Sequence, residues 1–374
     1  MEGLEMSSGT PQKCISKISL EDSRSVAIEL QEALFELAGE TVLVTGASGF
    51  LMGFLVDVLC AWNDLDLAQP IHVIALDNHM TGKPIRLAHL DRRPDVTICA
   101  HDVTENYTPD RPVHRIVHGA SIASPMVYRQ FPLETIDANV GGTRNMLELA
   151  RAQKVRGMLV MSTSEIYGDP EPDMIPTPED YRGSVSCTGP RACYDESKRL
   201  AETLATVYAK KFGLPVVSIR PFNVYGPDFR LDDQRVLPDF ISAALAGQSI
   251  VLLSDGRPTR TFCYVTDAVR AMLLLLIHGD AGEAYNVGND LGEISMLDLA
   301  RQVAKSGADV LGSEIVEVQF QQSADPDYLV DNPNRRCPDL TKIRAAIRWS
   351  PAVSLPDGLR RMITSYVEPE SHGL

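Results

Sequence analysis

Tyr194 and Lys198 are the residues whose types and spacing best suit catalysis. Residues four apart lie on one face of a helix, so the two side chains are expected to be neighbours. A phenol is a poor base at neutral pH, but a nearby positive charge such as an ammonium group stabilises the phenolate and lowers its pKa. The pair therefore indicates a tyrosine general base assisted by Lys198, with an ordinary surface helix pair as the alternative.

A second polar group, Ser162 to Glu165, directly follows the apolar run Met158–Met161. Such a run is typical of a buried strand, and the carboxyl ends of parallel strands line the ligand crevice of an open α/β sheet. Thr163 and Glu165 are therefore expected to face the same crevice as Tyr194.

A glycine-rich turn indicates a dinucleotide site. The β-rich run Thr41–Thr45 leads into Gly46-Ala-Ser-Gly49 and then into the helical pattern Leu51–Trp62. Glycines let the backbone approach a pyrophosphate, which the N-terminus of the following helix stabilises. The third position of the motif holds Met52 instead of the glycine that allows close helix–strand packing, so we expect Met52 to push or tilt the helix away.

Acidic residues close the next two strands. Asp77 follows the second strand, where a carboxylate accepts hydrogen bonds from the ribose hydroxyls and repels a 2′-phosphate, which favours NAD over NADP. Asp102 ends the third strand, within reach of the adenine amino group. We assign cofactor binding to Gly46, Ser48, Gly49, Phe50, Leu51, Asp77, Asn78, Asp102, Val103 and Lys198.

Strand and helix patterns alternate along the first part of the chain. The expected strands are Thr41–Thr45, Ile71–Leu76, Val96–Ala100, Ile116–His118, Met158–Met161 and Val216–Ile219, and the main helices are Leu51–Trp62, Asn139–Ala152 and Tyr194–Phe212. This alternation predicts an α/β fold, a Rossmann-type doubly wound parallel sheet.

The chain divides into three expected parts. Residues 1–39 form an N-terminal extension with one helix, which a capping box at Ser19-Leu-Glu-Asp22 opens and which runs to about Leu37. Residues 40–225 form the NAD-binding domain, to which residues 261–276 return. Residues 226–374, richer in proline and arginine, form a smaller C-terminal α/β substrate-binding domain.

Composition excludes several classes of protein. A net charge of −15 disfavours nucleic acid or an anionic membrane as a partner, so phosphate must bind in a local basic pocket. The 7 cysteines are scattered without metal-ligand spacing, which indicates reduced thiols and no metal site. There is no apolar run of about 18 residues, the length a membrane helix needs, and residues 1–39 lack a signal-peptide core. We expect a cytoplasmic protein.

From Thr41 to Tyr366 the chain resembles the extended short-chain dehydrogenase/reductase superfamily of NAD-dependent epimerases and dehydratases. The block Cys187-Thr-Gly-Pro-Arg-Ala-Cys-Tyr194-Asp-Glu-Ser-Lys-Arg199 is similar to the stretch typical of UDP-glucuronate decarboxylases. Sugar 4,6-dehydratases carry an aspartate after the threonine, where this chain has Ser164, and simple 4-epimerases usually carry no acid at the position of Glu165. The resemblance therefore favours a decarboxylase.

The resemblance implies a mechanism. Tyr194 takes the C4 hydroxyl proton of UDP-glucuronate while the C4 hydride goes to NAD, and the resulting ketone is β to the carboxylate. Loss of carbon dioxide leaves an enolate that Tyr194 and Thr163 hydrogen-bond. Glu165 orients the sugar or a water, and Arg260 contacts the substrate or assists proton delivery. The product is UDP-xylose if the hydride returns and UDP-4-ketoxylose if it does not.

The resemblance also implies a UDP-sugar pocket. Asn223 matches a diphosphate-side position, Arg235 and Arg336 are candidates for the pyrophosphate, and Arg191 is a candidate for the hexuronate carboxylate. The expected substrate-binding residues are Ser124, Tyr128, Glu165, Arg191, Asn223, Arg235, Arg260 and Arg336. A UDP-uronate 4-epimerase, an NDP-sugar 4,6-dehydratase and a non-catalytic nucleotide-binding relative remain as alternatives.

A homodimer is expected as well. The helical segments Asn139–Ala152 and Tyr194–Phe212 carry apolar stripes, and in this superfamily the equivalent helices pair into a four-helix isologous interface. The stripes include Met146, Leu147, Leu149, Leu200, Leu204 and Val207.

Overall fold

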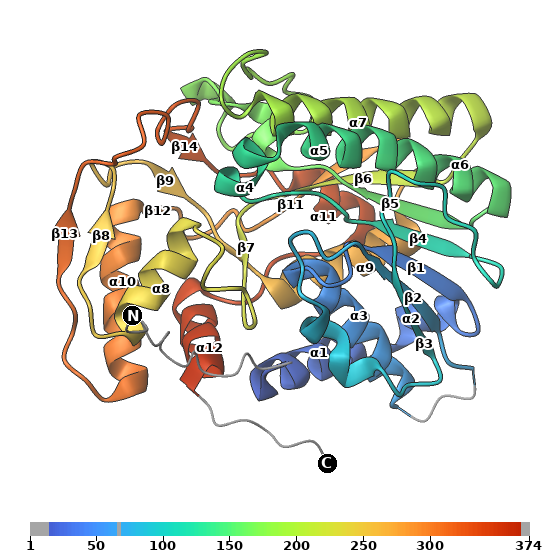
Figure 1. The fold of residues 1–374 in the computed structure, drawn as a ribbon, viewed down its shortest axis with the longest axis horizontal. Coiled ribbons are helices and arrows are strands. Elements are labelled where there is room, and N and C mark those ends of the chain that lie inside the picture. Colours follow the sequence, from blue (N-terminus) through green and yellow to red (C-terminus); the bar gives the residue numbers. More distant parts are fainter. Residues whose placement is uncertain (1–14, 66–68, 368–374) are drawn as a thin grey trace, which may run out of the picture.

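The computed structural model describes residues 15–65 and 69–367. Its centre is a parallel sheet of seven strands in the order β11-β6-β5-β4-β1-β2-β3, with helices on both faces (Figure 1). The strands are β1 (Thr41–Thr45), β2 (His72–Asp77), β3 (Val96–Ala100), β4 (Arg115–His118), β5 (Gly157–Met161), β6 (Val216–Pro221) and β11 (Ala284–Val287). This is the doubly wound Rossmann-type sheet that the sequence predicts.

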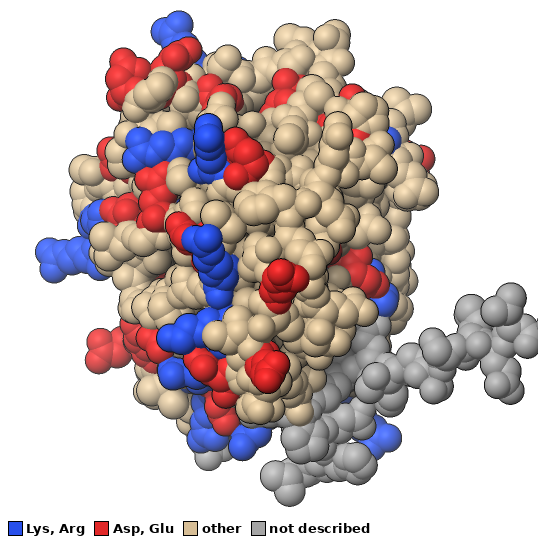
Figure 2. Space-filling view, turned by 90° about the vertical axis from the view of Figure 1, so that its left-hand side faces the viewer, with Lys and Arg blue, Asp and Glu red and all other residues tan. Residues whose placement is uncertain are grey.

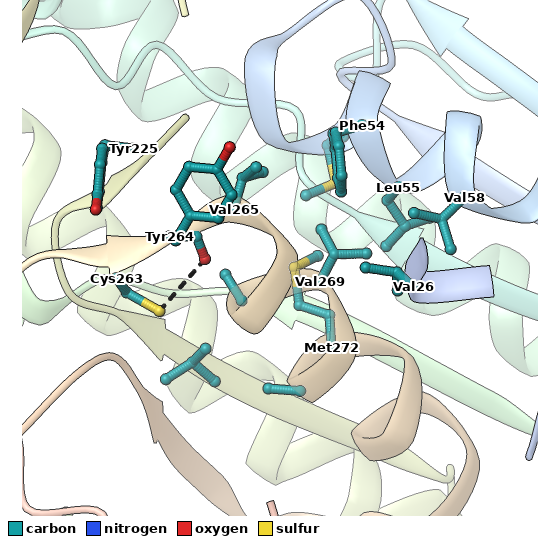
Figure 3. Close-up of a cluster of buried hydrophobic side chains, with 14 of the residues drawn as sticks. Val26, Phe54, Leu55, Val58, Tyr225, Cys263, Tyr264, Val265, Val269 and Met272 are labelled. Carbon is teal, nitrogen blue, oxygen red and sulfur yellow. Dashed lines mark hydrogen bonds between the residues drawn. The ribbon is translucent and has the colours of Figure 1, made fainter. Parts of the chain in front are cut away.

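The two faces of the sheet pack into separate cores, because successive side chains of a strand point to opposite sides. From β1, Val42 and Val44 join the core beneath α1, α3 and α9, whereas Leu43 joins the core beneath α6 and α7. These helices are α1 (Lys17–Glu29), α3 (Phe50–Asn63), α6 (Thr143–Gln153), α7 (Ala192–Phe212) and α9 (Val265–His278). Figure 3 shows Val26 of α1 against Leu55 and Val58 of α3.

Shorter elements connect the main ones. They are α2 (Gln31–Leu34), α4 (Pro125–Gln130), α5 (Pro132–Ile136), the 3₁₀ turns η1 (Phe35–Leu37), η2 (Pro84–Leu90), η4 (Ser164–Tyr167) and η5 (Pro172–Met174), and the π-helical turn η3 (Asp137–Gly142). The helix expected over 139–152 is thus a π turn followed by α6.

The remainder of the chain builds a smaller α/β part beside the sheet (Figure 1). Its elements are α8 (Val236–Leu245), α10 (Met296–Leu311), α12 (Leu355–Val367), β7 (Val224–Tyr225), β8 (Ile250–Leu252), β9 (Thr259–Arg260), β10 (Cys263–Tyr264), β12 (Ile294–Ser295), β13 (Val318–Phe320) and β14 (Arg335–Arg336). The helix α11 (Thr341–Ile347) instead packs against α9 and β11 of the sheet. On the side of the molecule that Figure 2 presents, acidic and basic side chains are interspersed rather than gathered into patches of one sign.

Two boundaries differ from the sequence-based expectation. The first helix begins at Lys17 because Ser16, not Ser19, is its N-cap and accepts a hydrogen bond from Ser19 N, and it breaks at Leu30 before α2. The return to the sheet, expected over 261–276, includes α9 and continues to β11, which pairs with β6 at the sheet edge. We propose the same division into domains, with β11 added to the NAD-binding domain.

Candidate active site

The turn between β1 and α3 has the geometry that a pyrophosphate needs. Gly46 has a φ of 73°, and a Cβ there would lie 2.9 Å from the backbone of Ala120, so only glycine fits. Gly49 is the N-cap of α3, no side chain caps this helix, and its first turn carries no acidic residue. The N-terminal N–H groups of α3 are therefore without an anionic side-chain partner, and this end of the helix suits a phosphate group.

Asp77 and Asp102 lie at the ends of β2 and β3, as expected. Asp77, which is 9% exposed, accepts hydrogen bonds from Ser48 N at 2.9 Å and His79 N at 2.7 Å. Asn78 Nδ2 donates to Asp102 Oδ2 at 2.8 Å. The bond from Ser48 fixes the Asp77 carboxylate beside the glycine turn, and Asn78 holds the Asp102 carboxylate at the end of the neighbouring strand. Phe50, also expected at the cofactor, stacks on Phe229 with ring centroids 4.7 Å apart.

Thr163 and Tyr194 come together although 31 residues separate them. Thr163 follows β5 and caps η4, and Tyr194 stands in the first turn of α7. Burial raises the pKa of Tyr194 to about 12, although a hydrogen bond with Thr163 acts to lower it. The phenol is therefore neutral in this structure, and it needs a further positive charge to act as a base.

Lys198 lies beside Tyr194 but does not contact its hydroxyl. Its Nζ donates to Met161 O at 2.8 Å and sits 5.9 Å from the centroid of the Tyr194 ring. Burial lowers the pKa of Lys198 to about 7. The two side chains are thus neighbours on one helix face, and Lys198 makes no hydrogen bond to the Tyr194 hydroxyl in this structure.

Glu165 is held by two arginines. Arg191, the N-cap residue of α7, donates to Glu165 Oε2. Arg336 of β14 donates to both carboxylate oxygens, one of them from Nη2 at 2.8 Å. Burial would raise the pKa of Glu165, but the charges of Arg191 and Arg336 outweigh it and hold the pKa well below its usual range. Arg336, expected at the pyrophosphate, therefore lies at the Glu165 end of the site.

Arg260 is enclosed by its own part of the chain. Its Nη1 donates to Thr259 O at 2.8 Å, and its Nη2 donates to Pro333 O at 2.6 Å and to Asn332 Oδ1 at 3.0 Å. Burial and the neighbouring Arg336 lower its pKa to about 9. In this structure Arg260 holds the segment that leads into Arg336, and it acts on the site through that segment.

The other expected substrate residues surround this centre. Tyr128 stacks on Tyr194 with ring centroids 5.0 Å apart, and Ser124 Oγ donates to Asp233 O at 2.9 Å. Arg235 pairs with Asp233 and lies over the Phe229 ring, 4.5 Å from its centroid. The loop with Arg235 thus meets the glycine turn through the stack of Phe229 on Phe50.

Asn223 and Asp195 complete the set. Asn223 has a φ of 41° and donates from Nδ2 to Thr261 O at 2.8 Å, so its side chain fixes the backbone between β6 and β10. Asp195, which the sequence did not single out, is 5% exposed and lies beside Arg191. Burial and the charge of Glu165 raise its pKa to about 7. The only sequence signal for Asp195 was its place next to Tyr194.

Within the described residues, no group of three His, Cys, Asp or Glu side chains could hold a metal ion. The helices in the described ranges include none that is long and apolar enough to cross a membrane.

A doubly wound sheet with a glycine turn after β1 and a Tyr-x-x-x-Lys pair on α7 defines an enzyme of the short-chain dehydrogenase type. Residues 42–288 match the NAD dependent epimerase/dehydratase family. The chain belongs to this family and, within it, to the UDP-glucuronic acid decarboxylases. UDP-glucuronic acid decarboxylase 5 of Arabidopsis thaliana is 38% identical over 333 residues, 89% of this chain and 91% of that protein.

A vertebrate relative has the same enzyme name, and two solved structures share the fold. UDP-glucuronic acid decarboxylase 1 of Xenopus tropicalis is 36% identical over 91% of this chain and 75% of its own length. A dTDP-glucose 4,6-dehydratase from Streptomyces venezuelae, with NAD bound, is 27% identical with a TM-score of 0.73 over 87% of this chain and 96% of that one. A UDP-glucose 4-epimerase from Thermotoga maritima shares the fold at 24% identity and a TM-score of 0.73, over 87% of this chain and 98% of that one.

Proposed function

We propose that this chain catalyses the NAD-dependent decarboxylation of UDP-glucuronate through a 4-keto-hexuronate. The observation that carries the proposal is the position of Glu165, a carboxylate held between Arg191 and Arg336 beside Thr163 and Tyr194, with Ser164 as its neighbour in sequence. The names of the relatives support the same reaction.

NAD, when bound at the glycine turn, supplies the acceptor for the C4 hydride and can return that hydride to the product. Tyr194 takes the proton of the C4 hydroxyl, for which its pKa must fall from about 12. The positive charges of the chain near it are Lys198, Arg191 and Arg235, and a bound cofactor would add another. When carbon dioxide leaves C5, Tyr194 and Thr163 hydrogen-bond the oxygen on C4 and stabilise its developing charge. A proton must then be added to C5, which converts the enolate to the keto-pentose.

The arginines give the site its selectivity for an acidic sugar. Arg191 and Arg336 are bonded to Glu165, and guanidinium forks bind carboxylates in pairs. We propose that Arg191 also meets the hexuronate carboxylate, while Arg235 and Asn223 lie toward the diphosphate. A 4,6-dehydratase needs an acid where Ser164 stands, and Ser164 is 3% exposed. The assembled Thr163, Tyr194 and Lys198 count against a non-catalytic protein.

The decisive experiment is the release of carbon dioxide from UDP-glucuronate by the purified protein with added NAD. Decarboxylation predicts carbon dioxide and a UDP-pentose, detected by mass spectrometry. A 4-epimerase leaves the mass of the hexuronate unchanged, and a dehydratase lowers it by one water. If the substrate is not changed at all, the chain is instead a non-catalytic protein that binds the nucleotide.

We also propose a homodimer that works in the cytoplasm. Met146 and Leu147 of the expected stripe are fully buried in the core under α6, so they are not available to a partner. Leu200 and Val207 of α7 are each 46% exposed, and Leu133 of neighbouring α5 is 70% exposed. The six cysteines that the structure describes are free thiols, as expected in a reducing compartment. A monomeric mass by light scattering at micromolar concentration would contradict the dimer.

A further inference from the structure

Three buried polar atoms beside Tyr194 have no hydrogen-bond partner among the described residues: Arg191 Nε, Asp195 Oδ1 and Tyr128 Oη. Buried polar atoms are nearly always paired, so a group of three calls for an explanation. All three side chains lie around the Glu165 carboxylate, which takes up the other end of the Arg191 guanidinium.

Two of the three arginines near Glu165, Arg336 and Arg260, already have hydrogen-bond partners for their guanidinium groups. Arg336 donates to both oxygens of Glu165, and Arg260 donates to the backbone of residues 259, 333 and 334. Arg191 differs from them, because a second carboxylate lies within reach. Its Nε is 4.0 Å from Asp195 Oδ2, too far for a hydrogen bond and close enough to form one after a small side-chain rotation.

We propose that Asp195 is a positioning residue for the reaction, which competes with Glu165 for the guanidinium of Arg191 and so decides how tightly Glu165 is held. This inference rests on the proposed decarboxylation. When Asp195 is ionised, Arg191 turns toward it, and the unpaired Nε and Oδ1 atoms find partners in each other. Glu165 then keeps only Arg336 as a partner and becomes more basic. The Nη2 group of Arg191, which Glu165 releases, is then available to the carboxylate of the sugar.

When Asp195 is protonated, its attraction for Arg191 falls and the guanidinium stays on Glu165. Glu165 is then neutralised by two arginines, which holds it unprotonated and weakly basic. The groups that face Asp195 are Glu165 from η4, Arg336 from β14, Asp331 from the segment before β14 and Tyr128 from α4, together with Arg191, Cys193 and Tyr194 at the start of α7. Burial and Glu165 place the pKa of Asp195 at about 7, where this change of state occurs in the working range of an enzyme.

The test is the pH dependence of kcat/KM for carbon dioxide release from UDP-glucuronate. The wild-type protein should lose activity as the pH falls through about 7, because Arg191 returns to Glu165. Asp195→Asn has the same shape and no charge, so its profile should be flat in this range, at a level about tenfold below the wild-type plateau. Asp195→Glu should restore the loss of activity at low pH, which we call the acid limb of the profile.

A matched control is available one residue further along α7. Glu196→Gln removes an exposed carboxylate that pairs with Arg199, and it should leave the wild-type profile unchanged. UDP, which has no sugar carboxylate, should bind the Asp195→Asn variant within about twofold of the wild-type affinity.

The outcomes separate two failures. If the wild-type protein releases no carbon dioxide at any pH, the proposed function is wrong. If it does, and Asp195→Asn keeps the acid limb at whatever rate, another group such as Lys198 titrates and the role of Asp195 is overturned. Should Asp195→Asn not fold, Arg191→Gln makes the same test, because removing the shared guanidinium must abolish the limb.

Discussion

The side chain of Met52 occupies the space that a side chain at Gly119 would need. A Cβ built on Gly119 would lie 2.5 Å from Met52 Cγ and closer still to its Sδ. Met52 stands in the first turn of α3 and is 4% exposed, and Gly119 follows β4. The motif's third glycine is thus replaced by a methionine, and the glycine that follows the neighbouring strand β4 provides the space for its side chain.

This pairing predicts that the two positions are energetically coupled. Gly119→Ala should destabilise the protein by about 1–3 kcal/mol, because its methyl group collides with the thioether. Met52→Ala should cost about 2–5 kcal/mol through the cavity that it leaves. The double variant should lose less than the sum, since the methyl group added at position 119 then fits. Additive losses in the free energy of unfolding, measured with denaturant, would contradict the coupling.

Tyr194→Phe should abolish turnover and preserve cofactor binding, because it removes only the oxygen that accepts the C4 proton. Loss of a general base costs about 100- to 10 000-fold in rate. The stack of the ring on Tyr128 is retained, so the fold should be unaffected. The measurements are kcat and the binding constant for NAD. A variant that keeps more than about a tenth of the wild-type rate would assign the base to another group.

The strands and the glycine turn of the NAD-binding part can largely be predicted from the sequence, because each depends on a short stretch of neighbouring residues. The runs Thr41–Thr45 and Val96–Ala100 have the bounds of β1 and β3. Each expected strand is a short run rich in β-branched and apolar residues, and the glycine motif lies between a strand and a helix. β11 was missed because it is only four residues long and follows the irregular part of the chain.

The contacts of Glu165 cannot be predicted from the sequence, because the residues that bind it are distant along the chain. Arg191 and Arg336 are 26 and 171 residues away from Glu165. Arg336 reaches it through β14, a two-residue strand that pairs with β9. Strands of this length have no periodicity, so their pairing depends on tertiary contacts such as those of Arg260. A sequence can suggest that an arginine binds an anion, but it does not say which anion.

His118 makes the stability of the protein depend on pH. Burial, and then the charge of Lys198, lower the pKa of His118 to about 3. Its ring nitrogens lie 2.8 Å from Thr45 Oγ1 and 3.1 Å from Thr143 Oγ1. An unfolded histidine has a pKa of about 6.5, so between these values the unfolded chain binds the extra proton. Stability contributed by neutral His118 is therefore complete above about pH 6.5 and falls as the pH drops toward about 3.

The slope of this loss approaches about 1.4 kcal/mol per pH unit. His118→Gln removes the titrating ring, so the difference in unfolding free energy between wild type and variant should shrink steadily from about pH 7 to about pH 5. The carboxylates titrate in both proteins, so their contribution cancels in the difference between the two unfolding free energies. A difference that is independent of pH would show that His118 keeps an ordinary pKa in the folded state.

The final prediction concerns the product, and it rests on the contact between Arg129 and Asp325. Arg129 of α4 donates to both oxygens of Asp325, from Nη1 at 2.7 Å and from Nη2 at 3.1 Å. Asp325 belongs to the segment 321–334 that leads into Arg336, and the carboxylate of Asp331 in this segment lies against Gly189. The segment is thus held to α4 by an ion pair and lies against the loop that precedes α7, the helix of Tyr194.

Return of the hydride requires the keto-pentose to stay in place until its C4 is reduced. Arg129→Gln should loosen the segment and let more keto-pentose escape, so the ratio of UDP-4-ketoxylose to UDP-xylose and the absorbance of NADH should both rise. Arg360→Gln removes an exposed arginine that pairs only with Asp357 among the contacts described, and it serves as the control. We expect UDP-xylose to be the main product of the wild-type protein. If Arg129→Gln leaves the product ratio unchanged while lowering kcat, the contact supports the fold of the site and does not retain the intermediate.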